Sequence, residues 1–329
     1  MALADTVARV EALLSARRYA EAARLLVDAA QRGEAEAAAE LAHWRIAGNL
    51  VSRDLGEARR LLAVAGSAGD DESALLHAGF LAAGVGGPEN WPAALAALGE
   101  LARRRPAAAA QLRLIRAMAL DGDGAPARPI ETRRLSEAPS VTAAQNFLSE
   151  AECHYLIAAG EPDLRPSAVV DPATGRMVPH PVRSSDAAVF GVYAEDLVVN
   201  ALNRRIATLS GTRLDQGEPL QLLRYRPGGE YKPHMDALPA EPNQRLWTVL
   251  VYLSDDYEGG ETRFPNTGLS FRGRAGDALL FRNAGPDGRA DPLSLHAGLP
   301  VTKGTKYLAS RWIRAAKFTF PPPKPMLEM

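Results

Sequence analysis

The chain has 329 residues, 47% of them hydrophobic, which is enough for about two domains with cores of their own. Its 38 lysine and arginine residues nearly balance 39 acidic residues, so no net charge draws it to nucleic acid or to an anionic membrane. A single cysteine, Cys153, excludes an internal disulfide framework and fits a reducing compartment.

The N-terminal stretch predicts an amphipathic helix. In "MALADTVARVEALLSARRYAEAARLL" charges interrupt the apolar residues every few positions, unlike the continuous apolar core of a signal peptide. The sequence also lacks a run of about 18 apolar residues, which a membrane-spanning helix would need. We therefore expect a cytoplasmic protein without a membrane span.

Up to residue 118 the chain is rich in Ala, Leu and Arg at helical spacing, and it repeats itself. The stretch "AARLLVDAAQRG" (22–33) returns as "EARRLLAVAGSAG" (57–69) and more loosely as "AALAALGELARRRP" (93–106). A period near 35 residues with two short helices per unit predicts a helical-repeat solenoid over residues 1–118. A plain helical bundle is the alternative.

This pattern resembles the Sel1-like repeats, which are relatives of the tetratricopeptide repeats. The shared features are small residues where helices cross and a glycine that ends the first helix of each unit. The resemblance implies a scaffold that recruits a protein partner.

The composition changes at residues 119–140, where Gly, Pro and charged residues predict a linker. Helical patterns follow at 149–160 and 194–211. Short β-branched runs between turns predict strands at 167–171, 220–225, 247–253, 269–272, 278–281 and 306–313. We expect a jelly-roll barrel (double-stranded β-helix) over residues 141–316, with helices packed on one sheet. A proline-rich tail at 317–329 favours an extended conformation.

Three residues of this second half can bind a metal together. His234 and Asp236, in "YRPGGEYKPHMDAL" (225–238), are two positions apart and share a face if they lie on one strand. His296 follows 60 residues after Asp236. Two imidazoles and one carboxylate leave about three positions open on an ion, as in non-haem Fe(II) oxygenases.

A lysine provides charge for an anionic ligand. Lys306 begins the last predicted strand and shares with Leu308 the face toward the expected barrel interior. A buried lysine without an anion is costly, so we expect it to bind a carboxylate of a small molecule. Tyr225, Thr248 and Tyr252 lie on the same faces of neighbouring predicted strands, which gives this interior hydroxyl groups.

Residues 140–316 resemble the prolyl 4-hydroxylase type of Fe(II)/2-oxoglutarate dioxygenases. Seven motifs occur in the order of that family: "NFLSEAECHYLI", "SAVVDPATG", "VRSSDAAVF", "LQLLRYRPGGEYKPHMD", "QRLWTVLVYLSDDYEGGETRFP", "GDALLF" and "PDGRADPLSLHAGLPVTKGTKYLASRWI". The resemblance implies an enzyme that hydroxylates an unactivated C–H bond with Fe(II), 2-oxoglutarate and O2, and with ascorbate as the reductant.

The resemblance also assigns roles to individual residues. Fe(II) would be held by His234, Asp236 and His296. The far carboxylate of 2-oxoglutarate would bind Lys306, with Tyr252 or Thr248 helping and Tyr225 close to the cosubstrate. The substrate would be contacted by Arg183, Ser185, Tyr231, Arg245 and Trp312. One departure from the family is Arg314, where several members carry a histidine.

The substrate that fits this resemblance best is peptidyl proline, recruited through the repeats. One alternative is the same chemistry on another amino-acid residue or on a small metabolite. A second is a repeat scaffold whose oxygenase domain is inactive. A halogenase is disfavoured because Asp236 supplies the carboxylate ligand. Nucleic-acid dealkylation is disfavoured because Lys306 replaces the arginine of such relatives and the sequence has no basic stripe.

Overall fold

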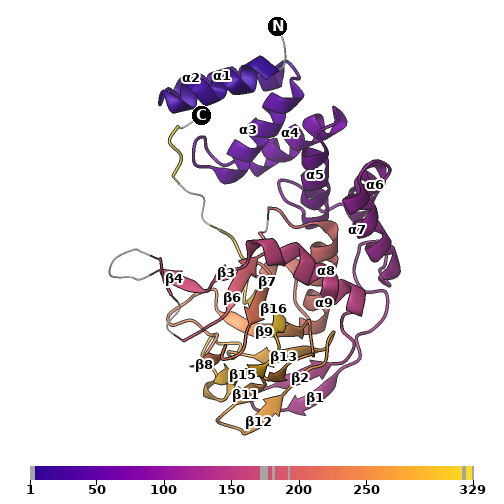
Figure 1. Cartoon of the computed structure of the whole chain (residues 1–329), viewed down its shortest axis with the longest axis vertical. Coiled ribbons are helices and arrows are strands. Elements are labelled where there is room, and N and C mark those ends of the chain that lie inside the picture. Colours follow the sequence, from indigo (N-terminus) through magenta and orange to yellow (C-terminus); the bar gives the residue numbers. More distant parts are fainter. Residues whose placement is uncertain (1–3, 171–176, 180–181, 192, 321–323, 328–329) are drawn as a thin grey trace. The chain divides into compact units, whose positions relative to one another are not determined.

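The structure is a computed structural model, which describes residues 4–170, 177–179, 182–191, 193–320 and 324–327. The chain forms two compact units (Figure 1). The first comprises residues 1–125, 192–201 and 319–329, and the second comprises residues 126–191 and 202–318. Among the described residues, no helix is both long and apolar enough to cross a bilayer.

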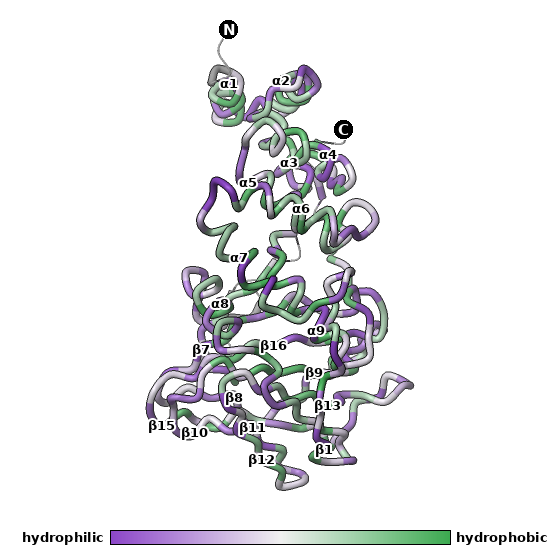
Figure 2. Tube along the Cα trace, turned by 90° about the vertical axis from the view of Figure 1, so that its right-hand side faces the viewer, coloured by the Kyte–Doolittle hydropathy of each residue, from purple (hydrophilic) through white to green (hydrophobic). Residues whose placement is uncertain are grey.

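The first unit consists of stacked helices, each of which packs on the next. Both hydrophobic and hydrophilic residues occur along each helix, as Figure 2 shows in green and purple. The residues that these helices bury against one another are mainly Ala and Leu. The helices are α1 (Ala4–Ser15), α2 (Tyr19–Gln31), α3 (Ala35–Ala47), α4 (Leu55–Ser67), α5 (Asp71–Ala83), α6 (Trp91–Ala102) and α7 (Pro106–Ala117).

These helices recur in pairs at a constant spacing. α2, α4 and α6 begin at Tyr19, Leu55 and Trp91, a spacing of 36 residues. α3 and α5 begin at Ala35 and Asp71, again 36 residues apart. The spacing agrees with the sequence period near 35 residues, so each repeat corresponds to one helix pair.

The ends of the paired helices repeat as well. Gly48 and Gly84 end α3 and α5 in the left-handed conformation, with φ of 70° and 66°. Asp54 and Asn90 begin α4 and α6, where each side chain accepts a hydrogen bond from a backbone N–H of the first turn. A Cβ at Gly48 would lie 2.8 Å from Cβ of Arg53, so both space and backbone conformation require glycine there.

The C-terminal tail completes the core of this unit. Leu327 packs against the buried cluster of the helices. The N–H groups of Met326 and Leu327 donate to the carbonyl groups of Asn49 and Leu50 at 2.8 and 3.0 Å. The cluster itself is built mainly from small and aliphatic residues, among them Ala22, Leu26, Ala38, Leu41, Ala58, Leu61 and Leu62.

The second unit contains two larger antiparallel sheets. The eight-stranded sheet has the order β1 (Arg133–Ser136), β2 (Val141–Ala144), β13 (Ala278–Arg282), β9 (Arg245–Tyr252), β16 (Lys306–Arg314), β7 (Gln221–Tyr225), β6 (Asp186–Val189) and β3 (Arg165–Pro166). The four-stranded sheet has the order β12 (Leu269–Phe271), β11 (Thr262–Phe264), β14 (His296–Gly298) and β8 (Tyr231–His234). Two further pairs join β10 (Glu258–Gly259) to β15 (Val301–Lys303) and β4 (Ala168–Val170) to β5 (Met177–Pro179).

One apolar core lies between the two larger sheets. Leu250, Phe281 and Leu308 reach it from the eight-stranded sheet, and Phe264 reaches it from the four-stranded sheet. The rings of Phe264 and Phe281 meet edge to face at 5.2 Å. Because alternate residues of a strand face opposite sides, this core also fixes which side chains line the space between the sheets.

Helix α8 (Glu150–Gly160) is held by its N-terminus and by a close contact at its end. Ser149 and Glu152 form a capping box, and Glu152 pairs with Arg205 of α9 (Leu197–Ser210) at 2.7 Å. At Gly160 a Cβ would lie 2.7 Å from a methyl group of Leu222 in β7, so the glycine permits close packing of the helix on the sheet.

Each of the six strand predictions coincides with a strand, namely β4, β7, β9, β12, β13 and β16; residue 171 of the first lies outside the described residues. The strands that the sequence did not predict are two to four residues long, although β4 and β12, which it did predict, have only three residues each. One of them, β1, lies inside the stretch 119–140 that the composition indicates as a linker.

Candidate metal centre and active site

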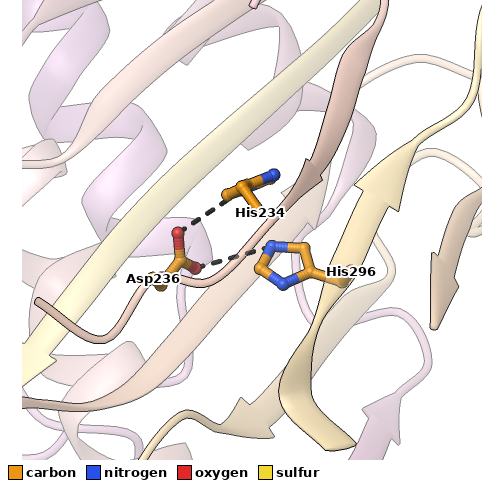
Figure 3. Close-up of side chains that lie close together, drawn as sticks. All are labelled: His234, Asp236 and His296. Carbon is orange, nitrogen blue, oxygen red and sulfur yellow. Dashed lines mark ion pairs between the residues drawn. The ribbon is translucent and has the colours of Figure 1, made fainter. Parts of the chain in front are cut away.

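Two histidines and an aspartate meet where two strands pair. β14 runs antiparallel to β8, and the register places His296 opposite His234. Asp236 follows two residues after the end of β8. The three side chains point toward one another (Figure 3), and the Nε2 atom of each histidine lies 3.6 Å from a carboxylate oxygen of Asp236. One ligand atom from each residue lies within 4.8 Å of the others, so the three can share one ion.

Backbone carbonyl groups fix the orientation of both imidazole rings. The Nδ1 atom of His234 lies 2.8 Å from the carbonyl oxygen of Lys232, and that of His296 lies 3.0 Å from the carbonyl oxygen of Ser294. Because a carbonyl oxygen can only accept, Nδ1 carries the proton in each ring and Nε2 keeps its lone pair. Both free nitrogens therefore face Asp236, as ligands of a shared metal would.

Protonation also suits a metal. Burial acts to raise the pKa of Asp236, but the neighbouring His296 and His234 and the hydroxyl of Thr248 outweigh burial and hold that pKa well below its usual range. Burial lowers the pKa of His296 to about 4. At neutral pH Asp236 is therefore ionised and His296 is neutral, which are the metal-binding forms. Two nitrogen donors and one carboxylate on one side of a site fit Fe(II) and leave coordination positions open.

A pocket adjoins this cluster. Lys306, Leu308, Ser310 and Trp312 form one of its walls, as alternate residues of β16. Tyr225 contributes from the neighbouring strand β7, and the metal-binding residues close one end. The pocket therefore connects the predicted metal site with the predicted lysine.

Lys306 is a cation in a buried position. Its side chain is only 3% exposed, and Nζ donates to the carbonyl group of Gly260 at 2.7 Å. The same atom lies 5.2 and 5.6 Å from the ring centres of Tyr252 and Tyr225. Burial lowers the pKa of Lys306 to about 8. Within the described part of the chain, no carboxylate forms an ion pair with it, so it is placed to receive the carboxylate of a ligand.

The two predicted tyrosines differ in their access to the pocket. Tyr225 lines it, and burial raises the pKa of its hydroxyl to about 12, so it remains a hydrogen-bond donor at neutral pH. Tyr252 is fully buried, with its hydroxyl 2.7 Å from Oγ1 of Thr262. Thr262 rather than Tyr252 lines the pocket, so Tyr252 contacts the pocket wall from behind.

Thr248 does not lie where the sequence predicts. It is expected beside Lys306, but its hydroxyl donates to Oδ2 of Asp236 at 2.6 Å. The strand register explains the difference, because Thr248 is opposite Trp312 whereas Tyr252 is opposite Leu308. Six residues of extended strand separate Trp312 from Lys306, which is about 20 Å. The hydroxyl therefore serves the metal end of the site and cannot reach the lysine end.

The expected substrate residues divide into two groups. Arg183, Tyr231 and Trp312 line the pocket. Tyr231 stacks on the ring of His234 with 3.4 Å between centroids, and the guanidinium of Arg183 lies 5.4 Å from the Tyr231 ring. These three residues therefore line the pocket that also contains the metal-binding residues.

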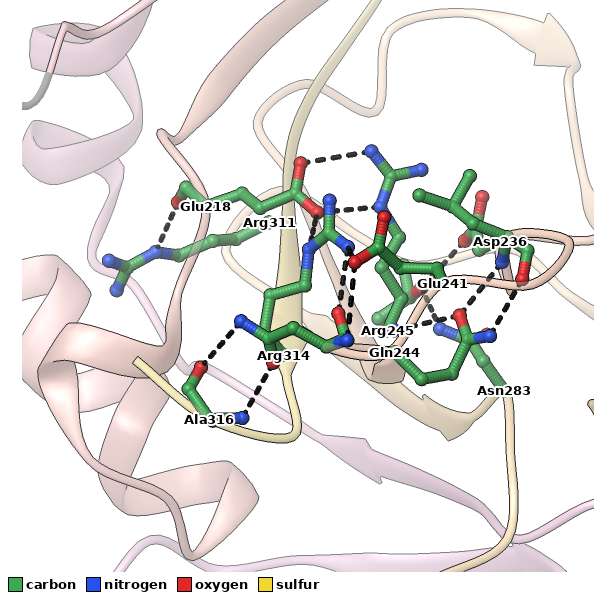
Figure 4. Close-up of polar contacts among 12 residues, drawn as sticks. Glu218, Asp236, Glu241, Gln244, Arg245, Asn283, Arg311, Arg314 and Ala316 are labelled. Atoms are coloured by element: carbon green, nitrogen blue, oxygen red, sulfur yellow. Dashed lines mark hydrogen bonds and ion pairs between the residues drawn. The ribbon is translucent and has the colours of Figure 1, made fainter. Parts of the chain in front are cut away.

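Ser185 and Arg245 do not line the pocket. Ser185 is buried, with its hydroxyl 2.9 Å from that of Ser167. Arg245 forms two hydrogen bonds with Glu218, at 2.6 and 2.9 Å, and lies 3.7 Å from the centre of the Trp312 ring (Figure 4). Through that contact Arg245 supports Trp312 from behind.

Sequence reasoning missed several residues of the site. Glu218 binds Arg245 and also lies 2.6 Å from Nε of Arg314, and the carbonyl group of Gly260 accepts a hydrogen bond from Nζ of Lys306. Asn283 and Thr262 contact other residues of the site through hydrogen bonds. The "GGET" motif is a signal that could have indicated Gly260 and Thr262, since a Gly pair before a strand permits close approach of its backbone. No local pattern marks Glu218 or Asn283, because each acts through a partner distant in sequence.

Comparison with known proteins agrees with this geometry. Residues 220–314 match the model of the 2OG-Fe(II) oxygenase superfamily. The chain is 38% identical over 211 residues to probable prolyl 4-hydroxylase 3 of Arabidopsis thaliana, covering 57% of this chain and 73% of that protein. It is 39% identical over 200 residues to prolyl 4-hydroxylase 1 of the same plant, covering 55% and 70%. Among solved structures, the viral collagen prolyl hydroxylase of Paramecium Bursaria Chlorella virus-1 is 29% identical, with a TM-score of 0.44 over 54% of this chain and 96% of that one.

A metal site of two histidines and one aspartate beside a buried lysine defines a 2-oxoglutarate-dependent Fe(II) oxygenase. Within that class, the chain belongs to the prolyl 4-hydroxylase family. When bound, Fe(II) and 2-oxoglutarate supply the oxidising chemistry, which places one oxygen atom of O2 on a C–H bond of the substrate and the other in succinate.

The residues of the chain bind and orient these groups. His234, Asp236 and His296 would hold the iron. Lys306 would bind the distal carboxylate of 2-oxoglutarate, and burial strengthens this attraction because it removes competing water. Tyr225 remains protonated and can donate to the cosubstrate. The apolar side chains Leu250 and Leu308 exclude water from the pocket between the two ends.

Proposed function

We propose that the protein hydroxylates proline residues of a peptide or protein substrate. The observation that carries the proposal is the identity of 38% and 39% to two plant proteins named as prolyl 4-hydroxylases, over more than two thirds of each. The segment matched by the family model, residues 220–314, contains most of the residues that line the pocket.

The lining of the pocket supports a peptide substrate. Tyr231 and Trp312 provide flat aromatic surfaces, which suit the ring of proline. Arg183 adds hydrogen-bond donors, and a peptide backbone offers carbonyl acceptors. Aromatic rings together with these donors therefore suit a proline within a peptide.

The helices of the first unit are proposed to form a Sel1-like solenoid that recruits the protein substrate. The support is the spacing of 36 residues between helix pairs, together with the repeated glycine ends and polar beginnings of the helices. The two larger sheets of the second unit are proposed to be those of a double-stranded β-helix. Ascorbate is the expected reductant that keeps the iron as Fe(II).

The proposal is tested by incubating the protein with Fe(II), 2-oxoglutarate, ascorbate and a panel of proline-rich peptides. Succinate formation and the addition of one oxygen atom to the peptide, located by tandem mass spectrometry, are measured together. We expect both with wild-type protein and neither with His234→Ala, which lacks an iron ligand. Oxygen added to a residue other than proline, or succinate formation that no peptide stimulates, would contradict the proposal while leaving the oxygenase chemistry intact.

A further inference from the structure

The metal-binding aspartate is held by a second buried pair of residues. Thr248 is 1% exposed and donates its only hydroxyl proton to Oδ2 of Asp236 at 2.6 Å. Asn283 is fully buried and follows directly after β13, and its Nδ2 lies 2.8 Å from Oγ1 of Thr248. Figure 4 shows Asn283 and Asp236 at one end of the polar network.

The direction of every proton in this chain of hydrogen bonds is determined. An ionised carboxylate can only accept, so the hydroxyl proton of Thr248 points to Asp236. The partner of Thr248 on its other side must therefore donate, which requires the NH2 group of Asn283 and not its carbonyl oxygen. The side-chain oxygen of Asn283 is left without a hydrogen-bond partner among the described residues. Asn283 thus forms this contact at the expense of a buried, unsatisfied acceptor.

The backbone of Asn283 also contacts the segment that leads to the second histidine. Its carbonyl group accepts from the backbone N–H of Asp291 at 2.9 Å, and the carbonyl group of Asp291 accepts from the hydroxyl of Ser294 at 2.7 Å. The carbonyl group of Ser294 in turn fixes Nδ1 of His296 at 3.0 Å. Asn283 is therefore connected to two of the three metal ligands, Asp236 through its side chain and His296 through its main chain.

We propose that Thr248 and Asn283 are positioning residues that make Asp236 bind iron through one oxygen only. The hydrogen bond from Thr248 uses a lone pair of Oδ2 and holds the plane of the carboxylate. This favours Oδ1, which lies 3.6 Å from Nε2 of His234, as the metal-binding atom over Oδ2, which lies 3.6 Å from Nε2 of His296. Asn283 supports this arrangement because its NH2 group prevents the Thr248 hydroxyl from turning away. A carboxylate that bound through both oxygens would occupy a coordination position that 2-oxoglutarate or O2 requires.

The test uses Mn(II), which binds such sites in place of Fe(II) without oxidation. Full-length wild-type protein and the variants Thr248→Val, Thr248→Ser and Asn283→Leu are titrated with Mn(II). Water proton relaxation then reports both the affinity and the number of exchangeable waters on the bound ion. Valine matches the shape of threonine without its hydroxyl, whereas serine retains the hydroxyl. Leucine at position 283 removes the amide together with its unsatisfied oxygen, so the fold is expected to tolerate it.

We expect Thr248→Val to weaken Mn(II) binding by about 10- to 100-fold, the range known for loss of a residue that supports a metal ligand. The bound ion should also lose about one exchangeable water, because the freed carboxylate can bind through both oxygens. Asn283→Leu should change both quantities in the same direction, and Thr248→Ser should restore them to within about threefold of wild type.

Two outcomes would overturn the proposal. Wild-type affinity and hydration in Thr248→Val would show that the hydroxyl does not control the carboxylate. Equal losses in Thr248→Val and Thr248→Ser would show that the methyl group and its packing matter instead. Circular dichroism of each variant distinguishes loss of the metal site from loss of the fold, and none of these measurements requires turnover.

Discussion

At the scale of single residues, Lys306 is the cation whose position is hardest to explain without a ligand. The protein buries its charge and gives it one carbonyl group and two aromatic rings as partners, together with the electrostatic attraction of Glu261, which forms no ion pair with it among the described residues. The lowered pKa of Lys306 reflects the free-energy cost of burying its charge. A dicarboxylic cosubstrate offsets this cost, because one of its carboxylates can bind the metal while the other reaches the lysine.

Replacing Lys306 should therefore affect 2-oxoglutarate more than iron. Methionine at position 306 keeps the length of the side chain and removes the charge, and breaking a buried charge pair costs about 2–5 kcal/mol. The apparent affinity for 2-oxoglutarate should fall by between about 30-fold and several thousand-fold. Calorimetric titration of the Mn(II)-loaded protein measures this change. An affinity within about threefold of wild type would show that Lys306 does not bind the cosubstrate.

The pKa of Lys306 also predicts a pH dependence. Because its pKa is lowered from 10.5 to about 8, the unliganded folded protein binds fewer protons than the unfolded chain between these values. Without ligand, the free energy of unfolding should therefore rise with pH across that window. Binding of 2-oxoglutarate requires the charged lysine, so its affinity should fall over the same pH range. Above pH 8 we expect the affinity to fall by about tenfold per pH unit. In Lys306→Arg, which stays charged, the affinity for 2-oxoglutarate should not change from neutral pH to pH 9. If the affinity of this variant falls as that of the wild type does, the pH dependence belongs to another group.

The site illustrates what alternation along a strand can and cannot predict. The metal ligands His234, Asp236 and His296 were predictable from residue type and spacing taken together with Lys306 and the resemblance to a known family. The face of Thr248 was also predictable, but its partner was not. That partner depends on the register of β9 against β16, which places Thr248 opposite Trp312. Asn283 was out of reach for the same reason, since its role arises from a neighbouring strand.

At the scale of elements, four of the six strands that a single sequence revealed, β7, β9, β13 and β16, belong to the larger sheet. The apolar runs of β9 and β13 are long enough to indicate a strand, whereas β4 and β12, which lie in other sheets, are only three residues long. β8 and β14, which carry the two histidines, are three or four residues long and mostly lack such runs. The two strands that position the metal ligands were therefore not predicted as strands. The ligands that they carry could still be recognised, because His and Asp are residue types that bind metals.

The N-terminus of α8 offers a test of element stability. Ser149 accepts from the N–H of Glu152, and the N–H of Ser149 donates to the carboxylate of Glu152 at 2.6 Å. Ser149→Ala should destabilise the second unit by about 0.5–2 kcal/mol, because it removes the side-chain acceptor at the helix start. Ser149→Thr retains that acceptor and serves as the control. Urea denaturation followed by tryptophan fluorescence measures both, and equal stability of the alanine variant and wild type would mean that the capping hydrogen bond contributes nothing.

At the scale of the whole molecule, both ends of the chain belong to the same compact unit. The repeat period of the helices was predictable, because helix pairs recur in both sequence and structure at nearly the same spacing. The position of the tail was not. Its proline-rich composition indicates only an extended conformation, whereas its binding depends on carbonyl groups of the loop after α3 and on the apolar cluster behind it.

Hydrogen bonds with residues of the helical unit hold the loop after α3 in place. Arg45 donates to the carbonyl group of Ser52 at 3.1 Å, and Arg53 donates to that of Ile46 at 3.0 Å. Gly48 provides the left-handed turn with which the loop begins. The carbonyl groups that accept from the tail are therefore held in place by residues of the helical unit, and the tail adds a leucine to an existing surface.

Leu327 should consequently stabilise the helical unit although it lies at the far end of the sequence. Leu327→Ala removes a partly buried side chain and should lower the free energy of unfolding of that unit by about 1–2 kcal/mol. Met326→Ala is the matched control, because the Met326 side chain is 63% exposed while its N–H makes an equivalent hydrogen bond.

Denaturation followed by far-ultraviolet circular dichroism measures the stability, and hydrogen exchange of the Leu327 amide reports whether the tail remains docked. Faster exchange at Leu327 together with lower stability in Leu327→Ala, and neither in Met326→Ala, is the expected result. Equal behaviour of the two variants would mean that the leucine side chain does not hold the tail.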